Sequence, residues 1–235
     1  MQLKAITKKQ MKIGILTAMK KEYDQIAMLL ENKKEIAGRV QHLVGKLGEK
    51  DIILQQCGIG KVNAAVCTAE LIRDYAPDCI ISTGVAGGID SSLHVMDVVV
   101  SDRLVHHDFY IGMGLAQGEI EGLPRFFPAA SSLVAAAEGL GEPSIHVGLI
   151  CTGDQFISAP SALSVIKQHF PEGLAVDMES AAIAQTCYLY DVPFVSFRII
   201  SDTPGVDNHV TQYKDFWGEM ANRSFAITQR FLSAL

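Results

Sequence analysis

The sequence predicts an α/β fold: one domain with a central mixed, largely parallel β-sheet that is flanked by helices on both faces. Short, nearly continuous apolar segments alternate along the chain with amphipathic segments of helical length. Strands that are apolar throughout are typical of sheets covered on both faces. The composition agrees, because 49% of the 235 residues are hydrophobic but only 7% are aromatic, which favours aliphatic side chains packed between helices and sheet.

The first ten residues differ from the rest of the chain. Residues 1–10 are polar and show no periodicity, and Met11 precedes the first apolar segment. We therefore expect a disordered extension over 1–10 and a single domain over 11–235.

After this extension, strand and helix patterns alternate. Short segments rich in aliphatic and β-branched residues indicate strands, and apolar residues near 3.6-residue spacing indicate helices. Strands are expected at 12–17, 41–47, 51–56, 79–83, 95–104, 145–151, 174–177 and 194–200. Helices are expected at 20–30, 60–76, 130–139, 160–168, 179–189 and 213–235.

Turn residues mark several of these boundaries. Gly48-Glu49-Lys50 is typical of the turn between two antiparallel strands. Gly60 opens the second expected helix and Pro77 ends it. The apolar face expected for that helix consists of Val62, Val66, Ala69, Ile72 and Tyr75.

Charge and cysteine content restrict the partners and the compartment. The formal net charge is −6 and no long run of Lys or Arg occurs, which argues against nucleic acid and against an anionic membrane surface as partners. No apolar segment is long enough to span a bilayer. The 5 cysteines are widely spread without a CxxC pair, so we expect buried thiols, a reducing compartment and a cytoplasmic location.

Three acidic residues stand where predicted strands end. In open parallel sheets, ligands bind at the carboxyl ends of the strands. Glu22 follows the first strand, Glu179 follows the strand 174–177, and Asp202 ends the strand 194–200. Each has a structural alternative, because Glu22 and Glu179 also complement a helix dipole and Asp202 also suits a turn. Together they predict a site, without deciding between a sugar, a metal and solvent.

Other segments give weaker signals. Gly58-Ile59-Gly60 lacks the third glycine of a dinucleotide fingerprint, and Thr83–Gly88 lacks the Lys of a phosphate-binding loop. His106-His107-Asp108 suggests metal, but neighbouring side chains on a strand point to opposite faces. Phe156 has the flat ring needed to stack on a ligand, although packing in a loop is the alternative. We expect no metal and no cofactor.

Six motifs in order resemble the 5′-methylthioadenosine/S-adenosylhomocysteine nucleosidases, over almost the whole chain from Met11. They are MKIGILTAMKKE (Met11–Glu22), CGIGKVNAA (Cys57–Ala65), STGVAGG (Ser82–Gly88), TGDQFI (Thr152–Ile157), VDMES (Val176–Ser180) and RIISD (Arg198–Asp202). The resemblance implies the nucleoside phosphorylase-like fold, a homodimer, and hydrolysis of an N-ribosidic bond that releases adenine.

The resemblance also implies a role for each matching residue. Asp202 would protonate adenine at N7, and Glu22 would activate the attacking water, with Arg198 helping to hold both Glu22 and the water. Glu179 would bind the ribose hydroxyls beside the Met178 backbone. The purine would contact Phe156 and the Ile157 backbone, and the 5′-alkylthio group would lie among Met19, Ile59, Met178 and Tyr213.

The chain departs from the family pattern at three places. Val85 stands where family members commonly have Ser, which removes a hydroxyl near the expected water. Thr203-Pro204 replaces small apolar residues after Asp202. The segment 109–124, which in the family contributes to a neighbouring subunit's pocket, matches poorly, and Ile111 and Met113 are its candidates.

Two other function classes compete with the hydrolase. A nucleoside phosphorylase would bind phosphate where the water lies, and an anionic Glu22 would repel it. A non-catalytic nucleoside-binding protein would have no need of an acid–base pair such as Glu22 and Asp202. Within the hydrolase class, 5′-deoxyadenosine and an aminodeoxyfutalosine-like nucleoside are alternative substrates.

Overall fold

The computed structural model describes residues 10–203, 209–217 and 221–235, and most of the expected extension 1–10 therefore lies outside the described residues. Strand β1 (Lys12–Thr17) is central to the sheet and pairs in parallel with β4 (Lys50–Gln56) and with β5 (Cys79–Gly88). Nearly all residues of β1 and β5 are buried, as expected for strands covered on both faces.

The other strands extend this centre into a 10-stranded mixed sheet. On one side, β3 (His42–Leu47) and β2 (Glu31–Glu35) continue antiparallel from β4. On the other side are β10 (Phe194–Asp202), β6 (Val98–His106), β8 (Ile145–Thr152) and β9 (Gly173–Asp177), with the short β7 (Phe127–Pro128) beside β6. Because β10 and β9 both pair with β5, these strands close into a ring.

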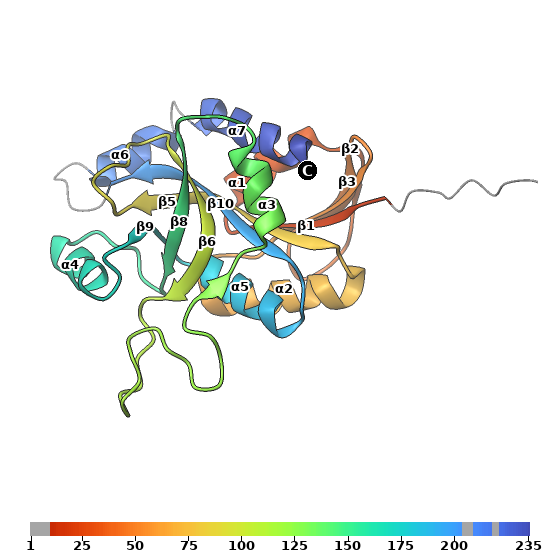
Figure 1. The fold of residues 1–235 in the computed structure, drawn as a ribbon. Coiled ribbons are helices and arrows are strands. Elements are labelled where there is room, and N and C mark those ends of the chain that lie inside the picture. Colours follow the sequence, from red (N-terminus) through yellow and green to blue (C-terminus); the bar gives the residue numbers. More distant parts are fainter. Residues whose placement is uncertain (1–9, 204–208, 218–220) are drawn as a thin grey trace, which may run out of the picture.

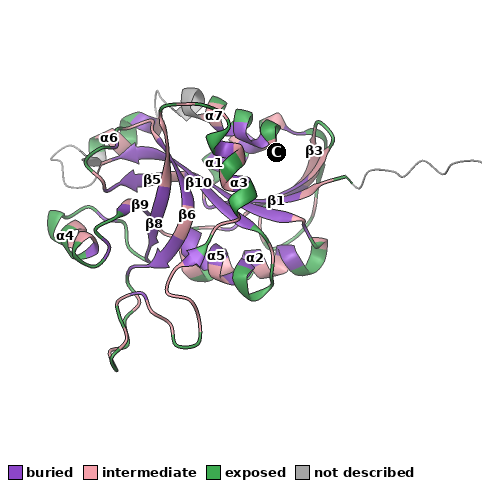
Figure 2. Ribbon diagram, viewed as in Figure 1, coloured by how far each residue is buried: buried purple, intermediate pink, exposed green. Residues whose placement is uncertain are grey.

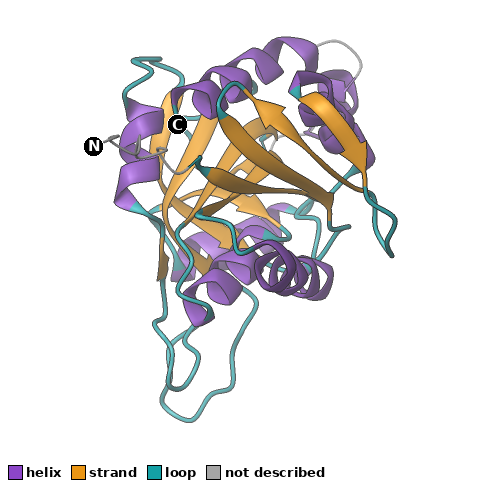
Figure 3. Cartoon of the chain, turned by 90° about the vertical axis from the view of Figure 1, so that its right-hand side faces the viewer, coloured by secondary structure: helices purple, strands orange, loops and turns teal. Residues whose placement is uncertain are grey.

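Helices cover both faces of the sheet (Figures 1 and 3). One layer contains α1 (Lys20–Leu29), α3 (Ser131–Glu138) and α7 (Ala221–Ala234), and the other contains α2 (Lys61–Tyr75) and α5 (Ser180–Leu189). The remaining helices α4 (Pro160–His169) and α6 (His209–Asp215) lie toward the strand ends. The central strands are buried and the outer helix surfaces are exposed (Figure 2). None of the helices in the described parts of the chain is long and apolar enough to cross a membrane.

The expectation of a mixed sheet flanked by helices is confirmed, but it lacked the two-residue β7 and the edge strand β2. Its sequence, Glu-Asn-Lys-Lys-Glu, has no apolar residue, and every one of its side chains is exposed. Charged side chains are typical of the edge of a sheet, where only one side of the backbone is paired. The sequence of β2 therefore has no alternation of apolar and polar residues from which a strand could be predicted.

Two helix expectations need correction. In α2 the buried residues are Ala64, Cys67, Thr68, Leu71 and Ile72, whereas Val62 and Val66 of the expected apolar face are exposed. Three of these five buried residues, Ala64, Cys67 and Thr68, are small, and α2 packs closely against α5. The single helix expected over 213–235 is replaced by α6, which begins at His209, and α7, which begins at Ala221; residues 218–220 lie outside the described chain.

Candidate active site

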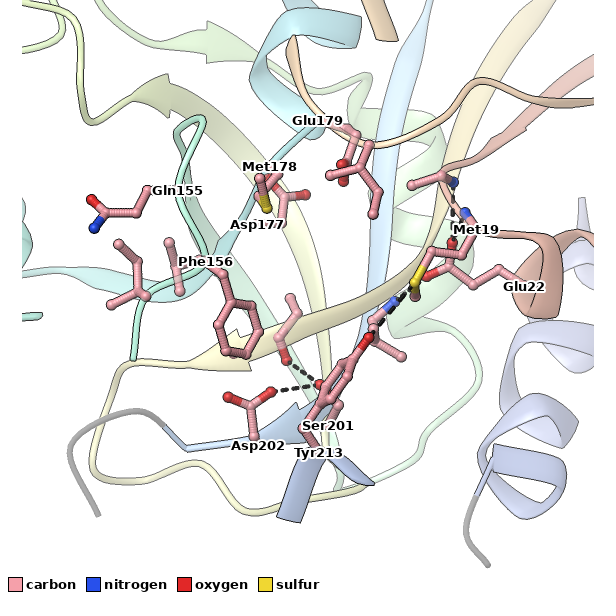
Figure 4. A pocket seen from close by; sticks show the side chains of 17 residues that line it. Met19, Glu22, Gln155, Phe156, Asp177, Met178, Glu179, Ser201, Asp202 and Tyr213 are labelled. Carbon is pink, nitrogen blue, oxygen red and sulfur yellow. Dashed lines mark hydrogen bonds between the residues drawn. The ribbon is translucent and has the colours of Figure 1, made fainter. Parts of the chain in front are cut away.

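A pocket of about 120 Å³ lies at the carboxyl ends of the central strands (Figure 4). Asp202 and Phe156 lie on one side of it, Met19 and Glu22 on the other, and Glu179 along a third edge (Figure 4). All but one of the site residues expected from the sequence line it: Met19, Glu22, Ile59, Val85, Phe156, Ile157, Met178, Glu179, Asp202 and Tyr213. The exception is Arg198, which lies behind the pocket wall.

Glu22 is a buried carboxyl group held by the backbone around it. It occupies the first turn of α1, where its Oε2 accepts hydrogen bonds from the N–H groups of Ala18 (3.0 Å) and Met19 (2.8 Å). Its Oε1 accepts one from the N–H of Val85 in β5 (3.0 Å). Burial raises the pKa of Glu22, and the charge of Arg198 and these backbone bonds oppose the rise. The carboxyl group is thereby fixed in place with a basicity above that of an exposed glutamate.

Gly84 is the reason why Glu22 can approach β5. A Cβ atom at position 84 would overlap Oε1 of Glu22 and would lie 2.8 Å from Nη1 of Arg198. The side chains of Glu22 and Arg198 therefore both approach Gly84 closely.

Arg198 lies in β10 with 1% of its surface exposed. Its Nη2 donates to Ser82 Oγ (2.7 Å) and its Nε donates to Ser180 Oγ (3.1 Å). The Nε atom lies 3.0 Å from Asp177 Oδ2, and Nη2 lies 3.8 Å from Glu179 Oε2. The ion pair with Asp177 was not anticipated, because Arg198 was expected to serve Glu22.

Glu179 immediately precedes α5, and its side chain contacts the N-terminus of α2. Its Oε1 accepts a hydrogen bond from the N–H of Gly60, which caps α2 (3.0 Å). Burial raises its pKa, the charge of Arg198 lowers it and that of Asp177 raises it, and the net result is a rise from 4.5 to about 7. Glu179 is therefore poised to change its charge near neutral pH.

Asp202 ends β10, and only 2% of its surface is exposed. Ser201 Oγ donates to its Oδ1 (2.7 Å). The next residue, Thr203, donates from its N–H and its hydroxyl to Gln212 Oε1 (both 3.0 Å), which ties the end of β10 to α6. Pro204 lies outside the described residues.

Aromatic and apolar side chains complete the pocket. The rings of Phe156 and Tyr213 pack edge to face with centroids 5.7 Å apart, and the Tyr213 hydroxyl donates to Met19 Sδ (3.6 Å). Phe156 and Ile59 are about half exposed at the pocket mouth. The Val85 side chain lines the pocket beside Glu22, so this wall is apolar.

Sequence reasoning missed the part played by Asp177 and read the neighbouring histidines only as a weak metal signal. Asp177 had been noted as part of a strand end without a role. His106 and His107 are buried, which lowers the pKa of both, and His106 Nε2 lies 2.9 Å from Gln185 Oε1. The described residues contain no group of three side chains arranged to hold a metal ion.

The fold and the pocket together define an enzyme site that combines buried carboxyl groups with an aromatic and apolar wall, suited to a small ligand with a flat ring. Such a site permits proton transfer at two separate points, near Glu22 and near Asp202. The comparisons with known proteins agree with this class.

The family model described as the phosphorylase superfamily matches residues 12–233. The 5′-methylthioadenosine/S-adenosylhomocysteine nucleosidase of Tolumonas auensis is 40% identical over 232 residues, which cover 96% of this chain and 100% of the relative. The chain therefore belongs to the 5′-methylthioadenosine/S-adenosylhomocysteine nucleosidase family of this superfamily.

Solved structures of the same family superpose closely on the chain. The nucleosidase of Neisseria meningitidis in complex with methylthio-immucillin-A gives a TM-score of 0.89 at 36% identity, covering 95% of this chain and 99% of that one. The nucleosidase of Colwellia psychrerythraea in complex with adenine gives 0.89 at 35% identity and covers 96% of each chain.

Proposed function

We infer that this chain is an N-glycosyl hydrolase that cleaves 5′-methylthioadenosine and S-adenosylhomocysteine to adenine and the 5′-thioribose. Family membership supports the reaction, since close relatives bear this activity in their names and related structures hold adenine or methylthio-immucillin-A. Within the site, one observation carries the inference: a buried Glu22, fixed by backbone N–H groups, lies across the pocket from a buried Asp202.

The chemistry of the bond explains why two carboxyl groups are needed. Cleavage of an N-ribosidic bond requires a protonated leaving group on one side and a nucleophile on the other. We assign Asp202 as the acid that protonates adenine at N7. Glu22 is assigned as the base that removes a proton from water, and its raised pKa makes it a better base than an exposed glutamate.

The remaining pocket residues would position the substrate. Glu179 accepts hydrogen bonds from the ribose hydroxyls, and charge-assisted bonds of this kind also orient the sugar. Phe156 stacks on the purine, and the Ile157 backbone contacts its edge. The 5′-alkylthio group lies against Met19, Ile59, Met178 and Tyr213, a wall that suits sulfur better than a free hydroxyl. Val85 leaves the water to be held by charged and backbone groups.

Assays with 5′-methylthioadenosine in the presence and absence of phosphate test the reaction. Adenine and free methylthioribose are expected at the same rate in both buffers. Release only with phosphate, giving the sugar 1-phosphate, would identify a phosphorylase. An absence of release in both buffers would redirect the search to 5′-deoxyadenosine or an aminodeoxyfutalosine-like nucleoside.

Asp202→Asn is expected to abolish turnover while adenine binding persists.

We further propose that the enzyme is a homodimer. The loop between β6 and β7 (residues 107–126) projects from the molecule on the side of α2 and α5 (Figures 1 and 3). Its apolar side chains Tyr110, Ile111 and Met113 are exposed, and Val62 and Val66 of α2 are exposed on the same side. Burial of this apolar surface by a second copy would also bring the loop to a neighbouring pocket.

The proposed compartment is the cytoplasm, and the proposed domain spans 11–235. All five cysteines are buried and free, which suits a reducing compartment. Helices from both ends of the chain, α1 and α7, pack against each other on the same face of one sheet, which suits a single domain.

A further inference from the structure

Arg198 is a single buried cation among three carboxyl groups. Asp177 is the nearest, with Oδ2 at 3.0 Å from Nε, and Glu179 lies 3.8 Å from Nη2. Glu22 and Arg198 approach Gly84 from the same side, close enough for the charge of Arg198 to lower the pKa of Glu22. One guanidinium cannot fully compensate three carboxylates in a low-dielectric interior, so these groups compete for it.

Asp177 is the best placed of the three competitors. Its Oδ1 accepts a hydrogen bond from Thr152 Oγ1 (2.6 Å), and its carboxylate also accepts from the N–H of Ser180 (3.3 Å) and from the Ser180 hydroxyl. These hydrogen bonds hold the carboxylate in place beside Arg198. Its side chain is 2% exposed, so water does not screen the ion pair with Arg198.

Asp177 also holds the framework of the site together. The hydroxyl of Thr152 that binds Asp177 accepts a hydrogen bond from the N–H of Ala181 at the start of α5 (2.9 Å). The carbonyl oxygen of Asp177 accepts from the N–H of Gly153 (3.1 Å), which begins the loop that carries Phe156. The residue thus joins β8, α5 and Arg198, and it also lines the pocket (Figure 4).

We propose that Asp177 is a positioning residue that takes up part of the Arg198 charge and thereby sets the pH at which Glu22 and Glu179 ionise. This rests on the proposed function, in which both glutamates act as carboxylates. Asp177 acts on Glu22 through Arg198, whereas it lies close enough to Glu179 to act on that residue directly.

The electrostatic surroundings agree with this arrangement. Asp177 raises and Arg198 lowers the pKa of Glu179, and Arg198 lowers that of Glu22. Removing the charge of Asp177 should therefore lower both pKa values, since Arg198 would then act undiminished. Among the described residues, the other titratable groups that interact with this cluster include Cys57, Cys151, His107 and Tyr213.

The test is the pH profile of kcat/KM for 5′-methylthioadenosine in Asp177→Asn, with Asp177→Glu as the charge-retaining control. Activity is lost at low pH as Glu22 and Glu179 are protonated. In Asp177→Asn this acid limb should move to lower pH by about one unit, the size expected when one nearby charge is changed. In Asp177→Glu it should stay in place, although kcat falls in both variants because the framework is disturbed.

A structural role alone would lower kcat in both variants without moving the acid limb, and that result would overturn the proposal. An upward shift in Asp177→Asn would overturn it equally. Should Asp177→Asn fail to fold, Asp177→Ser is the second neutral variant, with the same expected shift. The wild-type enzyme is assayed first without phosphate: failure there refutes the proposed hydrolysis, whereas an active wild type with an unmoved limb in the variant refutes only the role of Asp177.

Discussion

Glu22 is buried, yet three of its acceptor positions are filled by backbone N–H groups from two elements. An ionised carboxylate offers about four acceptor positions. In the proposed hydrolysis the remaining position would bind the attacking water, and the backbone bonds of Glu22 would fix where that water lies. The proposed base therefore needs no hydroxyl from Val85 beside it.

Gly84→Ala is expected to lower kcat/KM by about a hundredfold, the cost of a small misplacement of a catalytic group. The new Cβ would occupy the place of Glu22 Oε1, and the backbone bonds that fix Glu22 prevent an easy retreat. The measurement is steady-state adenine release from 5′-methylthioadenosine. Gly38→Ala is the matched control, because its Cβ would meet nothing closer than 3.9 Å. Equal activity in the two variants would contradict this account of Gly84.

We predict that the ionisation of Glu179 makes the protein less stable and more active as the pH rises. Its pKa rises from 4.5 to about 7 on folding, so its contribution to stability is full below pH 4.5 and is lost as the pH rises through 7. The loss amounts to roughly 3 kcal/mol. Relative to Glu179→Gln, the wild-type protein should therefore become less stable between pH 4.5 and 7, while its activity increases over the same range.

Urea unfolding of the wild type and Glu179→Gln at pH 5 and at pH 7.5, without substrate, measures this difference. The Gln side chain keeps the size of Glu179 but does not titrate. If the stability difference between the two proteins were the same at both pH values, Glu179 would have an ordinary pKa in the folded state.

At the scale of the elements, the buried strands were predictable and the edges were not. β1, β5 and β10 are buried almost throughout because helices cover both faces, and the apolar segments that they contain are visible in the sequence. β2 is defined only by its pairing with β3, which leaves no trace in its side chains. In α2, contact with α5 selects small residues, so the larger valines marked the exposed side.

The site residues likewise divide into those that could be predicted from the sequence and those that could not. Strand ends identified where Glu22, Glu179 and Asp202 lie, since the carboxyl ends of neighbouring strands meet at one edge. The ion pair between Asp177 and Arg198 depends instead on how β9 and β10 are brought together by the closed ring of strands. Pairing across a ring is set by topology, and no local pattern in the sequence encodes it.

Asp154 links the beginning of α2 to the loop that carries Phe156. Its Oδ1 accepts a hydrogen bond from the N–H of Lys61, the first residue of α2 (2.8 Å), while the N–H of Asp154 donates to Asp108 Oδ2 (2.9 Å). Asp154→Ala should raise KM severalfold with little change in kcat, because Phe156 and Gly60 are held less firmly. It should also cost about 1 kcal/mol of stability, the value of one such hydrogen bond.

Asp154→Asn retains an acceptor for the Lys61 N–H and is the matched control for that experiment. Its KM and midpoint of thermal unfolding should stay near those of the wild type. A fall in kcat at unchanged KM in Asp154→Ala would contradict a role in substrate binding.

At the scale of the whole molecule, the two helical layers differ in what they expose. On the side of α2, Val62 is 75% exposed, and Met113 of the projecting loop is 91% exposed. An isolated exposed apolar residue is common on any protein, but a group of them beside a projecting loop is typical of an interface. Met28 of α1 is also exposed, yet it lies on the opposite layer and stands apart.

Val62→Asp should therefore separate the proposed dimer, while Met28→Asp should leave it intact. An unpaired charge in an apolar interface is expected to weaken association by about a hundredfold or more. Sedimentation velocity at micromolar concentration would measure the change in mass. Because Ile111 and Met113 would no longer reach a neighbouring pocket, KM for 5′-methylthioadenosine should rise in Val62→Asp and not in Met28→Asp. A wild-type protein that sediments as a monomer, or a Val62→Asp variant that remains dimeric, would show that this face is not the interface.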